Sequence, residues 1–233
     1  MEKSLNLLIF TSLFDFFLPR FCFACNNKLE SNAVVICPDC FSKIQLAEKG
    51  RLVEEYKRKF SGKGIISDFT SAFVFEKDKE LQHVIHALKY QKCFSAGLFL
   101  GKKLGETLRD IISTWGISLI VPVPLHHLKK AERGYNQSTY IAKGLSKELK
   151  IPYSERAVKR TRFTESQTTM TLKERQANID GAFTVRDKNK VKGENILLID
   201  DVITTGSTIS ECGKALLDAG ANKVYAASVA IAD

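Results

Sequence analysis

Short, continuous apolar runs alternate with longer segments of helical periodicity through the part of the chain after residue 65. The apolar runs predict buried strands at 69–75, 117–122, 155–159, 183–186, 195–199 and 223–231. Apolar residues repeated every three or four positions predict helices at 78–90, 95–112, 135–149 and 207–219. Asp78 is the predicted N-cap of the first helix. Continuous apolar strands alternating with helices are typical of a mostly parallel sheet covered on both faces, so we predict an α/β fold.

Another apolar stretch precedes this alternation, from Leu5 to Leu18. Its spacing predicts one face of an amphipathic helix that ends at Pro19. The stretch is too short to cross a bilayer and is interrupted by Asp15, and neither a basic flank nor a small-residue cleavage site marks it as a signal peptide. We expect a cytoplasmic protein in which this helix docks on a partner surface, with attachment to a membrane surface as the weaker alternative.

Four of the six cysteines form two Cys-x-x-Cys pairs separated by 11 residues: Cys22, Cys25, Cys37 and Cys40. Four thiolates complete the closed tetrahedral site that structural Zn²⁺ prefers, so we predict a zinc lobe with no open position for catalysis. Two disulfides or a redox pair are the alternative. Within the lobe, residues 26–28 are turn formers and residues 34–36 resemble a short strand. The charged segment 45–65 is interpreted as a helix end and a linker, which divides the chain into a lobe at 1–60 and a main domain at 65–233.

The charge of the chain is unevenly distributed. It has 35 Lys and Arg residues against 26 Asp and Glu, a net charge of +9. Residues 121–180 contain 12 of the basic residues and 6 of the acidic ones. This excess favours an anionic partner such as a phosphate compound or nucleic acid, although a solvated basic face is an equally good interpretation. The apolar content of 44% excludes a disordered chain and a multi-span membrane protein.

The segment Ile196–Ser210 carries the most informative motif, because a predicted strand ends in Asp200 and Asp201 and a hydroxyl-rich loop and a helix follow. The unpaired N–H groups and the dipole at a helix start favour an anion, and Gly206 permits close approach of the backbone. The residues predicted to bind a phosphate monoester are Val202, Ile203, Thr204, Thr205, Gly206, Ser207 and Thr208. The two carboxylates would accept hydrogen bonds from sugar hydroxyls or hold Mg²⁺, so we predict a ribose 5-phosphate ligand. An ordinary strand–loop–helix connection is the alternative.

The string IDDVITTGST resembles the phosphoribosyl pyrophosphate (PRPP) signature of type I phosphoribosyltransferases. The order of motifs along the chain is similar to that of the ComF family of competence-associated, phosphoribosyltransferase-like proteins. These motifs are the cysteine pairs, LKYQ at 88–91, RGYNQ at 133–137, a Q-x4-L-x2-R-x2-N pattern at 167–178 and the PRPP signature. The resemblance covers nearly the whole chain. It implies a type I phosphoribosyltransferase-like fold, Mg-PRPP as the ligand and an association with DNA uptake.

The same resemblance implies roles for residues outside the PRPP signature. Pro122, Val123 and Pro124 stand where phosphoribosyltransferases place a pyrophosphate loop. The long polar segment 160–180 fits a flexible lid that closes on the pyrophosphate. The basic and polar residues assigned to the lid are Arg160, Arg162, Gln167, Lys173 and Arg175. The residues assigned to catalysis are Asp200, Asp201, Arg175 and Arg133.

Two functions remain open from the sequence. In the first, the chain is an enzyme, a phosphoribosyltransferase that transfers or cleaves the phosphoribosyl group of Mg-PRPP; its acceptor cannot be read from the residues. In the second, the chain is a non-catalytic competence factor that binds single-stranded DNA, or a PRPP sensor, with the same pocket, and it works with DNA-processing proteins. The sequence does not indicate an oligomeric state. His83 and His86 are interpreted as surface or packed residues, and Tyr135 as either a base-stacking or a core residue.

Overall fold

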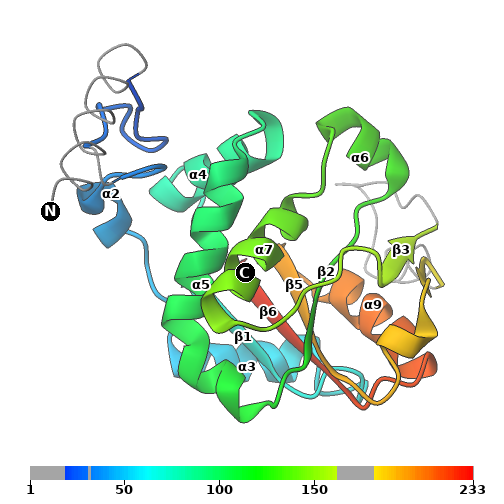
Figure 1. The fold of residues 1–233 in the computed structure, drawn as a ribbon. Helices are drawn as coiled ribbons and strands as arrows, with labels where there is room; N and C mark the ends of the chain where they lie inside the picture. The colour runs from blue at the N-terminus through cyan, green and yellow to red at the C-terminus, as the bar shows by residue number, and fades with distance from the viewer. Residues whose placement is uncertain (1–18, 31–32, 162–180, 233) are drawn as a thin grey trace, which may run out of the picture.

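A computed structural model describes residues 19–30, 33–161 and 181–232. Its main sheet is parallel and, within these residues, has four strands in the order β1-β6-β5-β2 (Figure 1). The strands are β1 (Phe69–Val74), β2 (Leu119–Pro122), β5 (Asn195–Ile203) and β6 (Lys223–Ile231). The predicted parallel α/β sheet is therefore confirmed, and the two inner strands β5 and β6 are its longest.

Helices cover both faces of this sheet (Figure 1). Leu197 and Ile199 of β5 pack on one face, and Ile196 and Leu198 pack on the other. The helices on the first face are α4 (Glu80–Tyr90), α5 (Phe94–Thr114) and α7 (Gln137–Leu149), and those on the second are α3 (Lys49–Lys59) and α9 (Ser207–Asp218). A strand buried on both faces reads as a continuous apolar run, which is why the sequence located β5 and β6 so well.

Helices α5 and α7 cross at unusually short range, because glycines stand where they meet. A Cβ atom at Gly101 would lie 2.0 Å from the carbonyl oxygen of Ile141, and one at Gly144 would lie 2.3 Å from that of Leu98. Side chains at these two positions would therefore force the helices apart. The close approach sets how α7 packs on α5, and the first turn of α7 reaches β5, where Ser138 donates to Asp200.

Two predicted strands leave the main sheet. The segment 155–159 becomes β3 (Val158–Arg160), which pairs antiparallel with β4 (Phe183–Val185) in a separate two-stranded sheet. Each of these strands buries its first residue and exposes its second. Strands of this length with one buried residue cannot form the centre of a sheet covered on both faces.

Several local predictions are corrected. The first helix begins at Glu80, and Asp78 is not its N-cap: the N-cap is Lys79, while Asp78 has a φ of 59° and donates its N–H to Gln82 Oε1 at 2.6 Å. Residues 34–36 form bends instead of a strand. A further helix, α6 (His127–Arg133), was not predicted, because it buries none of its residues and so lacks an apolar period.

The N-terminal lobe contains the short helix α2 (Pro38–Ser42) and packs on the same core as α4 and α5. Its buried residues include Cys22, Leu29 and Ile36. Leu52 of α3 instead joins the core on the opposite face of the sheet, although α3 lies within the predicted lobe at 1–60. The division at 60–65 therefore stays a prediction. The helix predicted at Leu5–Leu18 lies outside the described residues, and within the described ones no helix has the length and apolar character needed to cross a membrane.

Candidate functional site

The acidic pair lies near the carboxyl end of β5, where side chains from the start of α7 hold it. Ser138 Oγ donates to Asp200 Oδ1 at 2.9 Å, and the N–H of Asp201 donates to the same oxygen at 2.9 Å. Gln137 Nε2 lies 3.4 Å from Asp201 Oδ1. Asp200 is partly exposed, whereas Asp201 is only 4% exposed. The start of α7 is itself held by its N-cap Asn136, which donates to the Val123 carbonyl, so protein groups hold this pair in place.

An ion pair from α4 completes the surroundings of Asp201. Lys89 Nζ contacts Asp201 Oδ2, and only 23% of the Lys89 side chain and 6% of the Asp201 side chain are exposed. Burial alone would lower the pKa of Lys89, but the Asp201 carboxylate outweighs it and the pKa is raised. Lys89 therefore carries its charge into a nearly dry environment.

The two carboxyl groups of the pair differ in their pKa. Burial, together with the charge of Asp201, raises the pKa of Asp200 to about 8. Burial acts in the same direction on Asp201, but Lys89 outweighs it and holds the pKa of Asp201 below its usual range. Near neutral pH the pair therefore retains one proton, as expected for adjacent carboxyl groups that cannot both ionise. Asp201 is the permanent carboxylate, and Asp200 can donate a hydrogen bond as well as accept one.

The predicted phosphate loop follows the pair, but it is shorter than the sequence suggested. The strand β5 extends to Ile203, so it does not end at the acidic pair, and Val202 and Ile203 are strand residues. The connection to α9 consists of residues 204–206, with Thr204 and Thr205 exposed. Gly206 is the N-cap of α9 with a φ of 74°, in the left-handed region that favours glycine. The start of α9 and the hydroxyl groups near it are thus available to an anion.

Residues at the end of α3 contact this loop and hold it in place. Lys59 Nζ donates to the carbonyl oxygens of Thr204 and Ala232 and pairs with Glu55 at 2.8 Å, while only 4% of the Lys59 side chain is exposed. The next residue, Phe60, packs so closely under Gly206 that a Cβ there would lie 2.7 Å from the ring. The phosphate loop is therefore braced by two residues far from it in the sequence.

Basic side chains gather near the acidic pair. Burial lowers the pKa of Lys129, and the charges of Arg133, Arg160 and Lys89 lower it further, so these three cations lie close enough to Lys129 to repel it. Arg133 ends α6, donates to Gln137 Oε1 at 2.9 Å and places its guanidinium 5.3 Å from the centre of the Tyr90 ring. A concentration of like charge at one place is favourable only with an anion to compensate it.

Arg160, which begins the predicted lid segment, lies at the end of a strand, and its role in a lid stays a prediction. It is the last residue of β3, and its guanidinium lies 5.5 Å from the centre of the Phe183 ring. The carboxyl of Asp200 is near enough to raise the pKa of Arg160, although burial has the larger, opposite effect. The other predicted lid residues, Arg162, Gln167, Lys173 and Arg175, lie outside the described residues, and their roles stay predictions.

The predicted pyrophosphate loop, Pro122 to Pro124, lies beside β5. Pro122 ends β2, and the N–H of Val123 continues the ladder by donating to the Ile199 carbonyl at 2.9 Å. The Val123 carbonyl accepts from Asn136 Nδ2 at 2.9 Å, which ties this segment to the N-cap of α7. The segment thus lies beside the residue of β5 that precedes the acidic pair, and its role as a pyrophosphate loop stays a prediction.

The exposure of Tyr135, His83 and His86 decides between the alternative interpretations of these residues. Tyr135 is 6% exposed and packs edge-on against Phe94 and Tyr140, so it is a core residue. His83 and His86 are exposed on α4. Within the described part of the chain, the one group of three or more histidine, cysteine or acidic side chains close enough to share a metal ion is Cys22, Cys25, Cys37 and Cys40.

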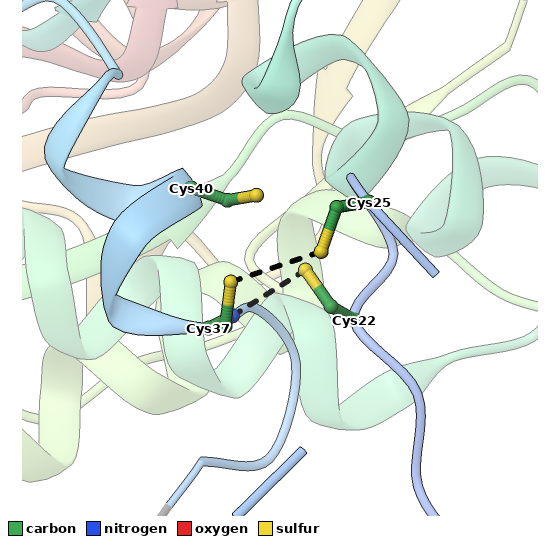
Figure 2. A group of neighbouring side chains, drawn as sticks. All are labelled: Cys22, Cys25, Cys37 and Cys40. Carbon is green, nitrogen blue, oxygen red and sulfur yellow. Dashed lines mark hydrogen bonds between the residues drawn. The ribbon is translucent and has the colours of Figure 1, made fainter. Parts of the chain in front are cut away.

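Figure 2 shows the four cysteine sulfurs of the N-terminal lobe turned toward one another. The sulfur atoms of Cys22, Cys25, Cys37 and Cys40 all lie within 4.8 Å of one another, and none forms a disulfide. Cys25 Sγ and Cys37 Sγ are 3.9 Å apart. In a tetrahedral site with Zn–S bonds of about 2.3 Å the sulfurs lie about 3.8 Å apart, so the cluster has the dimensions that zinc requires.

Hydrogen bonds in this cluster favour a thiolate. The N–H of Cys37 donates to Cys22 Sγ at 3.4 Å. Burial raises the pKa of the Cys22 thiol, but backbone N–H groups of Cys25, Cys37 and Ala24 lower it to about 7. The first cysteine pair is closed by the turn predicted there, with Asn26 at a φ of 59°. The residues present therefore fit a structural zinc ion.

Sequence reasoning missed four residues that hold the site: Lys59, Lys89, Gln137 and Ser138. Lys89 and Gln137 belong to the LKYQ and RGYNQ motifs, which were recognised but, apart from Arg133, given no role. Those motifs were the available signal. Lys59 and Ser138 follow no pattern, because each acts on a residue distant in the chain.

A family model described as the phosphoribosyl transferase domain matches residues 136–232. Competence protein F of Haemophilus influenzae is 36% identical over 148 residues, which cover 62% of this chain and 65% of that protein. The DNA utilization protein YhgH of Escherichia coli K12 is 35% identical over 147 residues, 62% of this chain and 64% of that protein. The chain is thus similar to these competence and DNA-utilization proteins, and its residues 136–232 are similar to a phosphoribosyl transferase domain.

More distant matches extend this result. Competence protein ComFC of Bacillus subtilis is 24% identical over 216 residues, which cover 86% of this chain and 79% of that protein. The glutamine PRPP amidotransferase structure from B. subtilis matches with a TM-score of 0.42 at 18% identity, over 62% of this chain and 30% of that chain, too remote a likeness to support an argument. The chain spans less than two thirds of competence protein F and of YhgH. The matched domain includes Gln137, Ser138, the acidic pair and the phosphate loop.

Proposed function

We propose that this competence-protein homologue binds Mg-PRPP at the carboxyl end of β5 and transfers or cleaves its phosphoribosyl group. One observation carries the proposal: a buried acidic pair, an anion-accepting loop and a group of cations meet at a single sheet edge. Carboxylates repel phosphate but accept hydrogen bonds from hydroxyls, whereas the loop and the cations attract phosphate. A ligand with a phosphate, adjacent hydroxyls and a pyrophosphate satisfies all three.

Each group then has a role in the reaction. The start of α9, with Thr204, Thr205, Ser207 and Thr208, would bind the 5-phosphate. The acidic pair would accept the ribose hydroxyls. Arg133, Lys129 and Arg160 would stabilise the charge that develops as the bond from ribose C1 to pyrophosphate breaks. Arg175 stays the predicted residue that adds to this from the lid.

The carboxylates are also the donors in this site that suit Mg²⁺, directly or through water. Bound there with PRPP, Mg²⁺ would offset part of the pyrophosphate charge. Zn²⁺ has a separate, structural role in the proposal, held by the four cysteines of the lobe.

Pyrophosphate release from PRPP with Mg²⁺ tests this function. We would measure it for the wild type, Asp200→Asn and Asp110→Asn, with and without a set of nucleobases and single-stranded DNA. Asp110 is exposed on α5, so its variant controls for the loss of one carboxylate away from the site. The proposal is supported if the wild type and Asp110→Asn release pyrophosphate and Asp200→Asn does not. No release by any variant, with the protein folded and its zinc bound, contradicts it.

Binding of single-stranded DNA without catalysis is the second candidate. The printed names of the relatives refer to competence and DNA utilization, and α6 adds exposed Lys130 to the cations near the acidic pair. This function predicts affinity for single-stranded DNA that falls steeply with salt. Such binding would persist in Asp200→Asn, whereas PRPP chemistry would not. Measuring both activities on the same variants separates the two functions.

A further inference from the structure

Lys89 is the only residue of α4 seen to contact the acidic pair, within the described part of the chain. Its neighbours in the helix differ sharply from it, because Leu88 is fully buried in the core and Tyr90 is 60% exposed. In the last turn of α4, Leu88 therefore packs in the core while Lys89 contacts Asp201. Because lysine is rarely buried unless it is paired, the contact between Lys89 and a buried carboxylate distinguishes it from an ordinary lysine of the protein surface.

The two members of the acidic pair, Asp200 and Asp201, differ in their hydrogen-bond partners and in their exposure. Asp201 has both oxygens engaged by protein groups, Oδ2 by Lys89 and Oδ1 by Gln137, and it is nearly inaccessible. Gln137 is itself held by Arg133 at 2.9 Å. Asp200 has its Oδ1 held by Ser138 and the backbone, and it is the more exposed of the two.

From this arrangement we propose that Lys89 is a positioning residue, which holds Asp201 as a buried counter-charge so that Asp200 is the carboxyl that meets the ribose hydroxyls. This inference rests on the proposed function, because it assigns the members of the acidic pair different parts in binding the same ligand. It also gives the LKYQ motif a physical role that its sequence alone did not disclose.

Charge balance makes the role of Lys89 testable. Removing Lys89 leaves Asp201 as an uncompensated buried charge next to Asp200, which disturbs the carboxyl that binds the ligand. Removing the charge of Asp201 at the same time relieves this disturbance, because a neutral pair of similar shape needs no counter-ion. A lysine that touched the ligand directly would not be rescued in this way.

The experiment measures binding of ribose 5-phosphate and of Mg-PRPP by calorimetry, together with thermal unfolding of each protein. The variants are Lys89→Met, Lys89→Arg, Asp201→Asn, Asp200→Asn and the double variant Lys89→Met/Asp201→Asn. Lys102→Met is the matched control, because Lys102 is an exposed lysine of α5 that also pairs with a carboxylate.

Lys89→Met is expected to weaken ribose 5-phosphate binding by about tenfold, and the double variant to recover most of that loss. Lys89→Arg should bind within about threefold of the wild type, since it keeps the charge, and Lys102→Met should bind normally. Asp200→Asn should lose more affinity than Asp201→Asn. This ranking of two single variants still decides the question if Lys89→Met does not fold.

Three results would overturn the inference alone, given that the wild type binds. They are a double variant no better than Lys89→Met, an Asp201→Asn protein as impaired as Asp200→Asn, and a Lys89→Met protein that binds normally. If the wild type binds neither ribose 5-phosphate nor Mg-PRPP, the proposed function fails and the inference fails with it. The wild-type measurement therefore tells the two failures apart.

Discussion

The acidic site is assembled from residues far apart in the chain, whereas the cysteine cluster comes from one short segment, and different forces hold the two. The acidic pair is fixed by hydrogen bonds from α7, an ion pair from α4 and a sheet buried on both faces. The cysteine cluster belongs to a small lobe with short elements, a five-residue helix and an isolated bridge between Phe21 and Lys28. A lobe of this size is expected to gain from a metal the stability that its own core cannot supply. The comparison teaches that protein groups alone organise the acidic pair, whereas we expect the cysteine lobe to depend on a metal ion.

The sharpest way to break this comparison is to remove the metal. Chelation, or Cys37→Ser, should abolish hydrogen-exchange protection in residues 19–30 and 33–47, since zinc binding in small domains contributes about 10 kcal/mol or more to folding. Protection in β5 and β6 should persist. Cys93→Ser is the control, because Cys93 lies outside the cluster. A lobe that stays protected without metal would show that its own packing suffices.

The next largest effect should come from the contact that positions α7. Gly101→Ala places a methyl group 2.0 Å from the Ile141 carbonyl, so we expect a loss of about 3 kcal/mol in the free energy of unfolding. Gly50→Ala, on α3 with no atom within 4 Å of the added Cβ, should leave stability unchanged or slightly raised. Urea unfolding measures both. Equal effects of the two substitutions would refute the importance of this helix contact.

A smaller effect is expected at the phosphate loop. Gly206→Ala combines a φ of 74° with a contact of 2.7 Å to the Phe60 ring, and should cost about 2 kcal/mol and weaken phosphate binding. Gly64→Ala is the matched control, since Gly64 also has a positive φ of 62° but no atom within 4 Å. The difference between the two variants isolates the contact with Phe60. If Gly64→Ala lowers stability more than Gly206→Ala does, the inferred support of the phosphate loop by Phe60 is contradicted.

The smallest effect, taken per pH unit, is a change of stability with pH. The pKa of Asp200 is raised to about 8, so the folded state binds a proton that the unfolded state has lost. Its contribution to stability is complete below the ordinary carboxyl pKa and is lost as the pH rises toward 8, with a slope of at most about 1.4 kcal/mol per pH unit. Asp200→Asn should flatten urea unfolding midpoints between pH 5 and about 8. An unchanged slope in this variant would assign the pH dependence to other groups.

How far the sequence could predict the molecule depended on whether the signal was local. The inner strands and the acidic loop were found because their apolar runs and their hydroxyl-rich connection are continuous in the chain. The cysteine cluster was found from its spacing, and its sulfurs do come together. Lys89 lies in a motif that the sequence displays, but its contact with Asp201 depends on the packing of α4, and Ser138 reaches Asp200 with no pattern in its neighbours to indicate it. The end of β3 at Arg160 was not predicted, because a strand of three residues has no distinctive period.

The sheet order has a consequence for dissecting the protein. Residues 136–232 match the phosphoribosyl transferase model, but both outer strands of the main sheet, β1 and β2, precede that range. A fragment cut to the matched residues would retain β5 and β6 with each outer edge unpaired, and exposed flat edges of this kind invite aggregation. The fragment would also lack Lys59 and Lys89. The matched segment is therefore smaller than the unit that can fold. A truncated protein should keep all residues from the start of α3 onward.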